Sequence, residues 1–215
     1  MQNNNDTYTS YPEWRAPAGV QHFSLTRTVA PADHAVSLEQ AKCMLRLPPD
    51  DSDEDVFLET LIDAVTAEVE NFLGRSIITQ TWKYTLDCFP CMIQLPRPPL
   101  LSVASITYID TDESSQTLSS SVYQVDVLSD PARIMEAAGQ SWPSTSGESL
   151  NAVTVTYTAC YGADTTDTPA NIQAAILMMV NDLYNNREAQ ILGTIVSDNP
   201  AVARLLAPHK LPRYY

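Results

Sequence analysis

The chain has 215 residues, 44% of them hydrophobic, which suffices for one compact body with extensions. No apolar run approaches the roughly 20 residues that a membrane-spanning helix needs, and the first residues lack the basic and apolar regions of a signal peptide. We therefore expect a protein made in a cytoplasm, with no membrane partner. The net charge of -14 disfavours binding to a nucleic-acid backbone, but it is compatible with a channel in which DNA slides without sticking.

Residues 1–35 contain three prolines, many Asn, Ser and Thr residues, and no sustained hydrophobic periodicity. This composition predicts an extended N-terminal arm rather than a separately folded unit. Four aromatic residues of the arm are candidates for contacting a neighbouring subunit, and a disordered tail is the alternative that remains open. They are Tyr8, Tyr11, Trp14 and Phe23.

Two helices are predicted next. Ser37 and Gln40 have the spacing of a capping box, which predicts a helix over 37–47 that stops at the following prolines. Apolar residues then recur at helical spacing up to Leu73, behind an acidic first turn, and predict a helix over 52–73. Gly74 provides the left-handed residue that commonly ends a helix.

Nine acidic residues and no Lys or Arg lie between Asp50 and Glu70. A solvated helix face explains such a run, and a surface that meets a basic partner or lines a channel is the sharper alternative. The candidates for this lumen or inter-subunit acidic face are Asp51, Asp53, Glu54, Asp55 and Glu59.

From 76 to 161 the hydrophobic period becomes two, with turn residues between the runs, so we expect an inserted antiparallel β-module. Within it, Cys88 and Cys91 have the spacing of zinc and redox sites, but no second ligand pair accompanies them, and ordinary small side chains explain them better. Asp110 begins a stretch like a calcium loop that lacks the obligatory Gly, which indicates a hairpin tip instead. We therefore expect no metal ion and no cofactor.

A last long helix is predicted over 169–188, with Thr168 as its N-cap and Pro169 in its first turn. Residues 191–215 then read as a C-terminal arm that contains one short helical turn. The expected fold class is thus α+β: two N-terminal helices and a long C-terminal helix form a helical core over 36–190, the β-module is inserted, and both ends are extended arms. Motifs of hydrolases, nucleotide-binding proteins and metalloproteases are absent from the sequence, which argues against an enzyme.

The order of several short segments resembles the head-tail connector, or head-completion adaptor, proteins of tailed bacteriophages. Each segment alone is weakly diagnostic, and their order over roughly 36–190 carries the resemblance. The segments are Val36 to Leu47, Gly74-Arg75-Ser76 up to Trp82, Leu95 to Leu100, Val103 to Ile109, Tyr123 to Val125, Val153 to Tyr157 with Tyr161-Gly162, and Pro169 to Glu188.

The resemblance implies a structural virion protein that forms a ring, commonly of twelve subunits, between the portal and the tail. Such a ring completes the head after DNA packaging, gives DNA a channel that it traverses without sequence-specific binding, and offers a platform to tail, stopper or nozzle proteins. A tail-completion or stopper protein of the neck is the alternative. The resemblance also implies that the C-terminal segment reaches the portal, which makes Leu205, Leu206, Leu211, Arg213, Tyr214 and Tyr215 candidate portal contacts.

Overall fold

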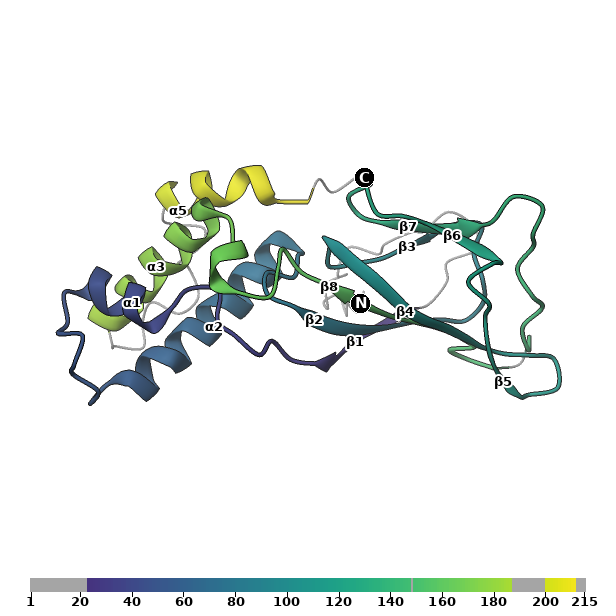
Figure 1. Cartoon of the computed structure of the whole chain (residues 1–215), viewed down its shortest axis with the longest axis horizontal. Coiled ribbons are helices and arrows are strands. Elements are labelled where there is room, and N and C mark those ends of the chain that lie inside the picture. The colour runs from purple at the N-terminus through teal and green to yellow at the C-terminus, as the bar shows by residue number, and fades with distance from the viewer. Residues whose placement is uncertain (1–22, 148, 187–199, 212–215) are drawn as a thin grey trace, which may run out of the picture.

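The computed structural model describes residues 23–147, 149–186 and 200–211. These residues form an elongated body with a helical lobe at one end and a β-lobe at the other (Figure 1). The mixed α+β class that the sequence predicts is confirmed. None of the helices in the described ranges is long and apolar enough to cross a membrane.

The helical lobe is built around α3, which packs against α1, α2 and α5. Its core joins the apolar faces of these helices and includes fully buried Ile62, Val65, Ile176 and Met179. The helices are α1 (Leu38–Leu45), α2 (Asp55–Leu73), α3 (Ala170–Asn185) and α5 (Pro200–Leu206), with short 3-10 turns η1 (Thr165–Asp167) and η2 (Ala207–His209).

The ends of α1 and α2 follow the local sequence signals. Ser37 and Gln40 form the expected reciprocal capping box, and Gly74 ends α2 with a φ of 73°. The start of α3 differs from the prediction, because Pro169 and not Thr168 occupies the N-cap position. The Thr168 side chain is buried, and its hydroxyl has no hydrogen-bond partner among the described residues.

The β-lobe contains two antiparallel sheets. The larger sheet has the order β1-β2-β8-β4-β5, and the smaller one β3-β7-β6. Their facing sides share one core, in which Ile93 and Ile134 of the small sheet pack with Ile106, Val155 and Tyr157 of the large one. The strands are β1 (Phe23–Val29), β2 (Gln80–Leu86), β3 (Ile93–Gln94), β4 (Leu100–Ile109), β5 (Ser115–Thr117), β6 (Tyr123–Asp126), β7 (Arg133–Glu136) and β8 (Val153–Ala159).

Strand β1 corrects the boundary of the expected N-terminal arm. It pairs along its length with β2, from Phe23 opposite Leu86 to Val29 opposite Thr81. The strand lies at the edge of the sheet, and only Leu25 of its residues is half-buried. Phe23, Leu25 and Val29 do alternate with polar residues, but Arg27 interrupts this short pattern. Residues 23–29 are therefore part of the β-lobe, and only the segment before them lies outside the described residues.

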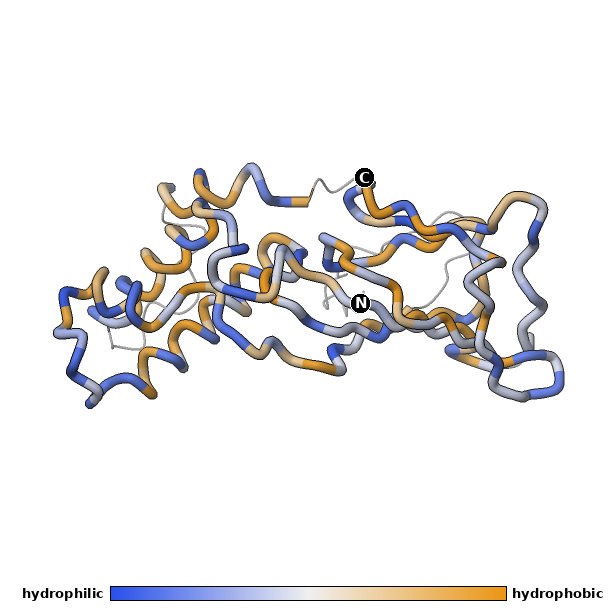
Figure 2. Tube along the Cα trace, viewed as in Figure 1, coloured by the Kyte–Doolittle hydropathy of each residue, from blue (hydrophilic) through white to orange (hydrophobic). Residues whose placement is uncertain are grey.

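The outer face of the large sheet is lined by hydroxyl groups. Cross-strand pairing sets Thr85 beside Thr154 and Thr154 beside Thr107. The next two rows on one side are Lys83, Thr156 and Ser105, and then Thr81, Thr158 and Ser102. Figure 2 shows the resulting alternation of polar and apolar residues along the strands. The face comprises Ser24, Thr26, Thr81, Lys83, Thr85, Ser102, Ser105, Thr107, Thr117, Thr154, Thr156 and Thr158, and none of these residues is acidic.

Candidate assembly surfaces

The five acidic residues proposed for a lumen or inter-subunit face divide into two groups. Asp51, Asp53 and Glu59 are exposed to solvent. Asp55 instead pairs with Lys42 of α1 at 2.6 Å, and Glu54 accepts a hydrogen bond from the Tyr184 hydroxyl of α3. Two of the candidates thus fasten the start of α2 to its neighbouring helices, and three remain available to a partner.

Lys42 shows why this corner of the helical lobe is well defined. Its side chain is 8% exposed, and its ammonium also donates to the backbone oxygens of Asp51 at 2.7 Å and Pro49 at 3.3 Å. The loop between α1 and α2 is therefore wrapped around one buried positive charge. A buried ammonium needs such partners, because losing its hydration is costly.

Farther along α2, Glu70 belongs to the junction between the lobes. Its carboxylate accepts hydrogen bonds from the Ile77 backbone N–H at 2.7 Å and from the Gln80 amide at 2.5 Å. Burial raises the pKa of Glu70, although these hydrogen bonds oppose the rise. Arg97 donates to the Glu70 backbone oxygen at 2.9 Å and lies over the Trp82 ring. The last residue of the acidic run therefore stabilises the junction between the lobes.

The C-terminal helix α5 docks on the helical lobe of its own chain. Leu206 is fully buried in the helical core and Leu205 packs partly against it, while the Leu211 backbone N–H donates to the Leu73 oxygen at 3.3 Å. Leu206 thus offers no side-chain surface to a partner, which corrects the expectation for this residue. Leu205 and Leu211 are half-buried by the same packing. Arg213, Tyr214 and Tyr215 lie outside the described residues.

Arg75 holds this C-terminal segment at the junction. Its guanidinium donates to the His209 backbone oxygen and pairs with Asp130 of the β6–β7 loop, so one side chain joins α2, η2 and the small sheet. The Tyr161 hydroxyl lies 3.3 Å from His209 Nδ1. Burial and the nearby Arg75 lower the pKa of His209. Sequence reasoning missed this cluster, since its members are far apart along the chain and form no motif.

Among the N-terminal aromatic candidates, the structure describes Phe23 alone. Its side chain is 66% exposed, and its ring centroid lies 5.7 Å from that of Tyr84. Phe23 therefore has one packing partner in its own sheet and an open side. Tyr8, Tyr11 and Trp14 lie outside the described residues.

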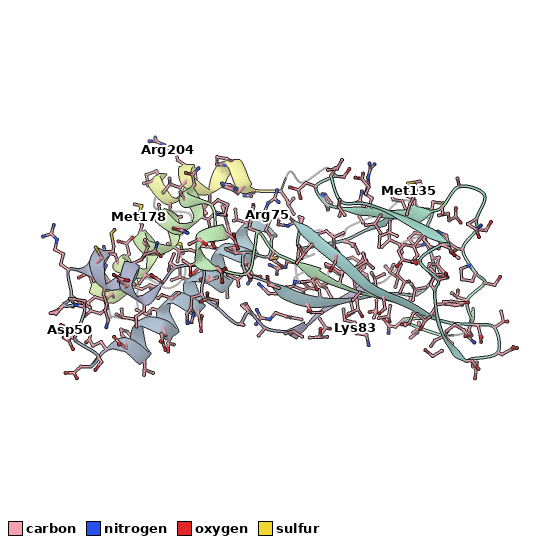
Figure 3. All side chains as sticks on the ribbon, in the orientation of Figure 1. Asp50, Arg75, Lys83, Met135, Met178 and Arg204 are labelled. Carbon is pink, nitrogen blue, oxygen red and sulfur yellow. The ribbon has the colours of Figure 1, made fainter. Side chains whose placement is uncertain are left out.

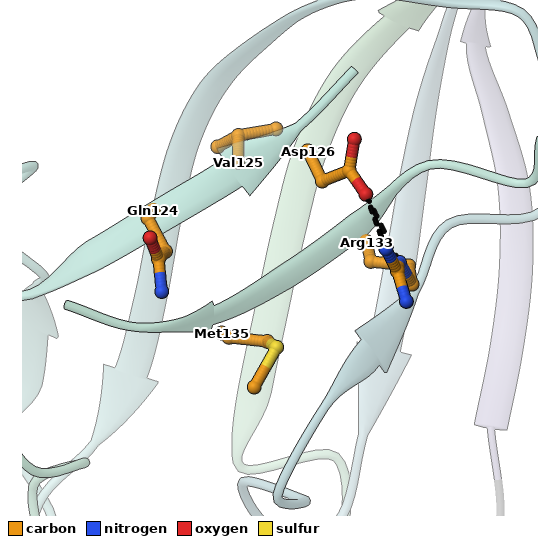
Figure 4. Close-up of a pocket in the computed structure, with 5 residues that line it drawn as sticks. All are labelled: Gln124, Val125, Asp126, Arg133 and Met135. Atoms are coloured by element: carbon orange, nitrogen blue, oxygen red, sulfur yellow. Dashed lines mark hydrogen bonds and ion pairs between the residues drawn. The ribbon is translucent and has the colours of Figure 1, made fainter. Parts of the chain in front are cut away.

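The surface hollows of the described residues are small. One of about 200 Å³ lies on the outer face of the small sheet, where Asp126 pairs with Arg133 at 2.5 Å (Figure 4). Hydrogen bonds from Ser129 and Arg133 lower the pKa of Asp126. Another, of about 230 Å³, is lined by residues of the β1–α1 linker and of α2, including His34 and Asp63, which pair at 2.8 Å.

The cysteine and calcium-loop motifs behave as small structural features. Cys88 and Cys91 are exposed, and the described residues contain no cluster of His, Cys, Asp or Glu that could hold a metal ion. The Asp110 carboxylate accepts hydrogen bonds from the backbone N–H groups of Asp112 and Ser114, which confirms the expected tip of the β4–β5 hairpin.

Comparisons with known proteins show what the chain resembles. The family described as phage gp6-like head-tail connector protein matches residues 35–131. The resemblance that the sequence indicates is therefore confirmed over this segment. No curated protein matches the chain.

Three solved structures share the fold. The chain matches the neck of an empty GTA particle computed with C6 symmetry, with a TM-score of 0.73 and 19% identity. It also matches the virion of a native gene transfer agent (GTA) particle, at 0.72 and 20%, and the neck of a native GTA particle computed with C12 symmetry, at 0.67 and 17%. Each match covers 89% of this chain and 97% of the other. At 17 to 20% identity, these matches show that the chain shares the fold of the three structures.

Proposed function

We propose that this protein is a non-enzymatic subunit of the virion neck that forms a ring of twelve copies between the portal and the tail. The ring completes the head after DNA packaging, leaves a channel for DNA and presents a platform to tail or stopper proteins. The observation that carries the proposal is the joint match to the head-tail connector family and to neck structures of C6 and C12 symmetry.

The C-terminal end is the proposed contact with the portal. Residues from Pro200 to Leu211 contain no acid, and the four residues that follow add one Arg and two Tyr. Arg and Tyr are enriched among the residues that dominate interface energies. Because α5 is packed into the helical lobe, we assign the contact to Arg213, Tyr214 and Tyr215, with Leu211 at its base.

Portal binding tests this function directly. The purified chain is mixed with the portal ring of the same particle, and the complex is weighed by native mass spectrometry. We expect many copies to load on each portal, and we expect a variant without residues 212–215 to lose most of this binding while it keeps its fold. Lys83→Glu, a change on the outer face of the large sheet, is the control and should bind normally. A chain that ignores the portal but binds a tail-side protein would favour the stopper or tail-completion alternative.

The exposed acids at the start of α2 suit a DNA channel. Asp51 and Asp53 are exposed, and carboxylates repel the DNA backbone. We expect Asp51→Lys together with Asp53→Lys to slow or trap DNA during ejection, measured as release of DNA from virions that carry the variant. Normal ejection would show that Asp51 and Asp53 do not line the channel.

A further inference from the structure

One side of the helical lobe carries unneutralised negative charge. Glu59 and Asp63, one turn apart, are exposed on the side of α2 that faces away from α3. Glu68 lies on another side of the helix, one turn before Phe72, whose ring the Lys210 ammonium covers. Within the described part of the chain, Glu59 forms no ion pair, and Asp63 meets only His34 while its own side chain stays 69% exposed. These carboxylates are free to meet a basic surface.

The same face of α2 permits another backbone to come close. Val56, Thr60, Ala64 and Ala67 recur at helical spacing next to the acids, and all four are exposed. Val56 is 77% exposed, although it is apolar and follows directly on the first residue of the helix. The face thus combines a strip of small side chains with carboxylates beside it, and interfaces likewise have an apolar centre and a polar rim.

The opposite charge lies on the C-terminal segment. Arg204 of α5 and Lys210 after η2 are exposed, and the described stretch from Pro200 to Leu211 contains no acidic residue. The exposed neighbours of Arg204 are small, among them Ala207 and Pro208. Arg204 forms no ion pair within the described residues, and Figure 3 shows its side chain extending away from the body.

These two faces point to different sides of the lobe. Helix α3 packs against both α2 and α5, and Figure 1 shows it between α5 and the first half of α2. In Figure 3, Arg204 and Asp50, which precedes α2, lie on opposite sides of the lobe. Within one chain the acidic face and Arg204 are therefore too well separated to neutralise each other.

We propose that the outer face of α2 in one copy docks on the α5–η2 face of the next copy, with Arg204 placed between Glu59 and Asp63. Two different complementary patches on opposite sides of a subunit are what a head-to-tail ring requires. This contact rests on the ring of the proposed function and names the surfaces that build it. It assigns Glu59 to the contact between subunits and leaves Asp51 and Asp53 to the channel.

Charge reversal tests the contact on the full chain. Arg204→Glu is one variant, and Glu59→Lys with Asp63→Lys is the other. Self-association is followed by sedimentation velocity over a range of protein concentrations at low salt. We expect each variant alone to associate at least about tenfold more weakly than the original chain, because like charges then face each other. A 1:1 mixture should recover association, since every contact in an alternating ring again joins opposite charges.

Matched controls separate this result from a general effect of charge. Lys83→Glu changes the charge as Arg204→Glu does, but on the outer face of the large sheet, and Asp112→Lys reverses an exposed acid at the β4–β5 hairpin tip. Both should associate like the original chain. Failure of the mixture to recover, or an equal loss in the controls, overturns the proposal.

Disulfide trapping detects the contact even where the subunits associate only weakly in free solution. In a chain whose exposed Cys43, Cys88 and Cys91 are replaced by Ser, Ala64→Cys and Ala207→Cys are introduced together. Oxidation should give a ladder of oligomers on a non-reducing gel, whereas either Cys alone should give no product beyond a dimer. Absence of the ladder at high protein concentration also overturns the proposal. Portal loading is measured separately, so a chain that binds the portal without this ladder keeps the proposed function and loses only the proposed contact.

Discussion

The two lobes differ in where they place charge. The helical lobe separates an acidic face on α2 from a basic C-terminal segment. The outer face of the large sheet instead repeats Ser and Thr on neighbouring strands, with Lys83 as its charged residue. Thr suits an exposed strand position without providing strong binding energy. The separated acidic and basic surfaces of this subunit therefore lie on its helices, while the sheet gives a mostly uncharged polar surface.

Core substitutions give the largest expected effect and test whether the lobes depend on each other. Ile62 and Ile106 are both fully buried, one in each core. We expect Ile62→Ala and Ile106→Ala each to lower the free energy of unfolding by about 2 to 5 kcal/mol in denaturant titrations. Leu128→Ala, at a side chain that is 94% exposed, should change it little. Two separate transitions in either core variant would show that the lobes unfold independently.

Arg75 gives the next effect, because it joins both lobes to the C-terminal segment. Arg75→Ala should cost about 2 kcal/mol through its charged hydrogen bonds and should selectively speed amide hydrogen exchange in α5 and η2. Arg133→Ala breaks the partly exposed pair with Asp126 and is the matched control, with a much smaller loss. Unchanged exchange in α5 would contradict the role assigned to Arg75.

Glu70 gives the smallest effect, and it depends on pH. Because burial raises the pKa of Glu70 above its ordinary value of 4.5, the folded chain binds this proton more tightly than the unfolded chain does. The stabilising contribution is complete below about pH 4.5 and is lost as the pH rises through the raised pKa. Glu70→Gln keeps an oxygen for Ile77 and Gln80 but does not titrate. The stability of the variant relative to the original chain should therefore be greater at about pH 7 than at about pH 4, as measured by thermal unfolding at both pH values. The same stability difference at both pH values would contradict the assigned burial of Glu70.

The helices were readable from sequence because their signals are local. The Ser37 capping box and the Gly74 stop each lie within a few residues, and both formed as expected. Strand β1 was missed because its alternation of Phe23, Leu25 and Val29 with polar residues is short and broken by Arg27, and because its pairing partner β2 is distant in the sequence. Thr168 fitted the usual cap preference, but Pro169 took the N-cap position.

The candidate sites were harder to predict, since they depend on contacts between distant residues. Leu206 looked like an exposed interface residue in a basic tail, yet its side chain closes the helical core. Asp55 looked like part of an acidic patch, but it pairs with Lys42. A charge run in the sequence does not reveal which of its members already have partners within the fold.

The central position of β8 has a consequence for synthesis on the ribosome. Strand β8 lies between β2 and β4, although it follows them by about 70 and 50 residues, and the helical core likewise waits for α3 and α5. Neither core can close until the last third of the chain has emerged. Such long-range pairings form slowly. Helix α2, which is synthesised early, must therefore avoid non-native contacts until α3 and α5 have been synthesised. The acids of α2 give incomplete chains a negative charge, and such charge disfavours their association.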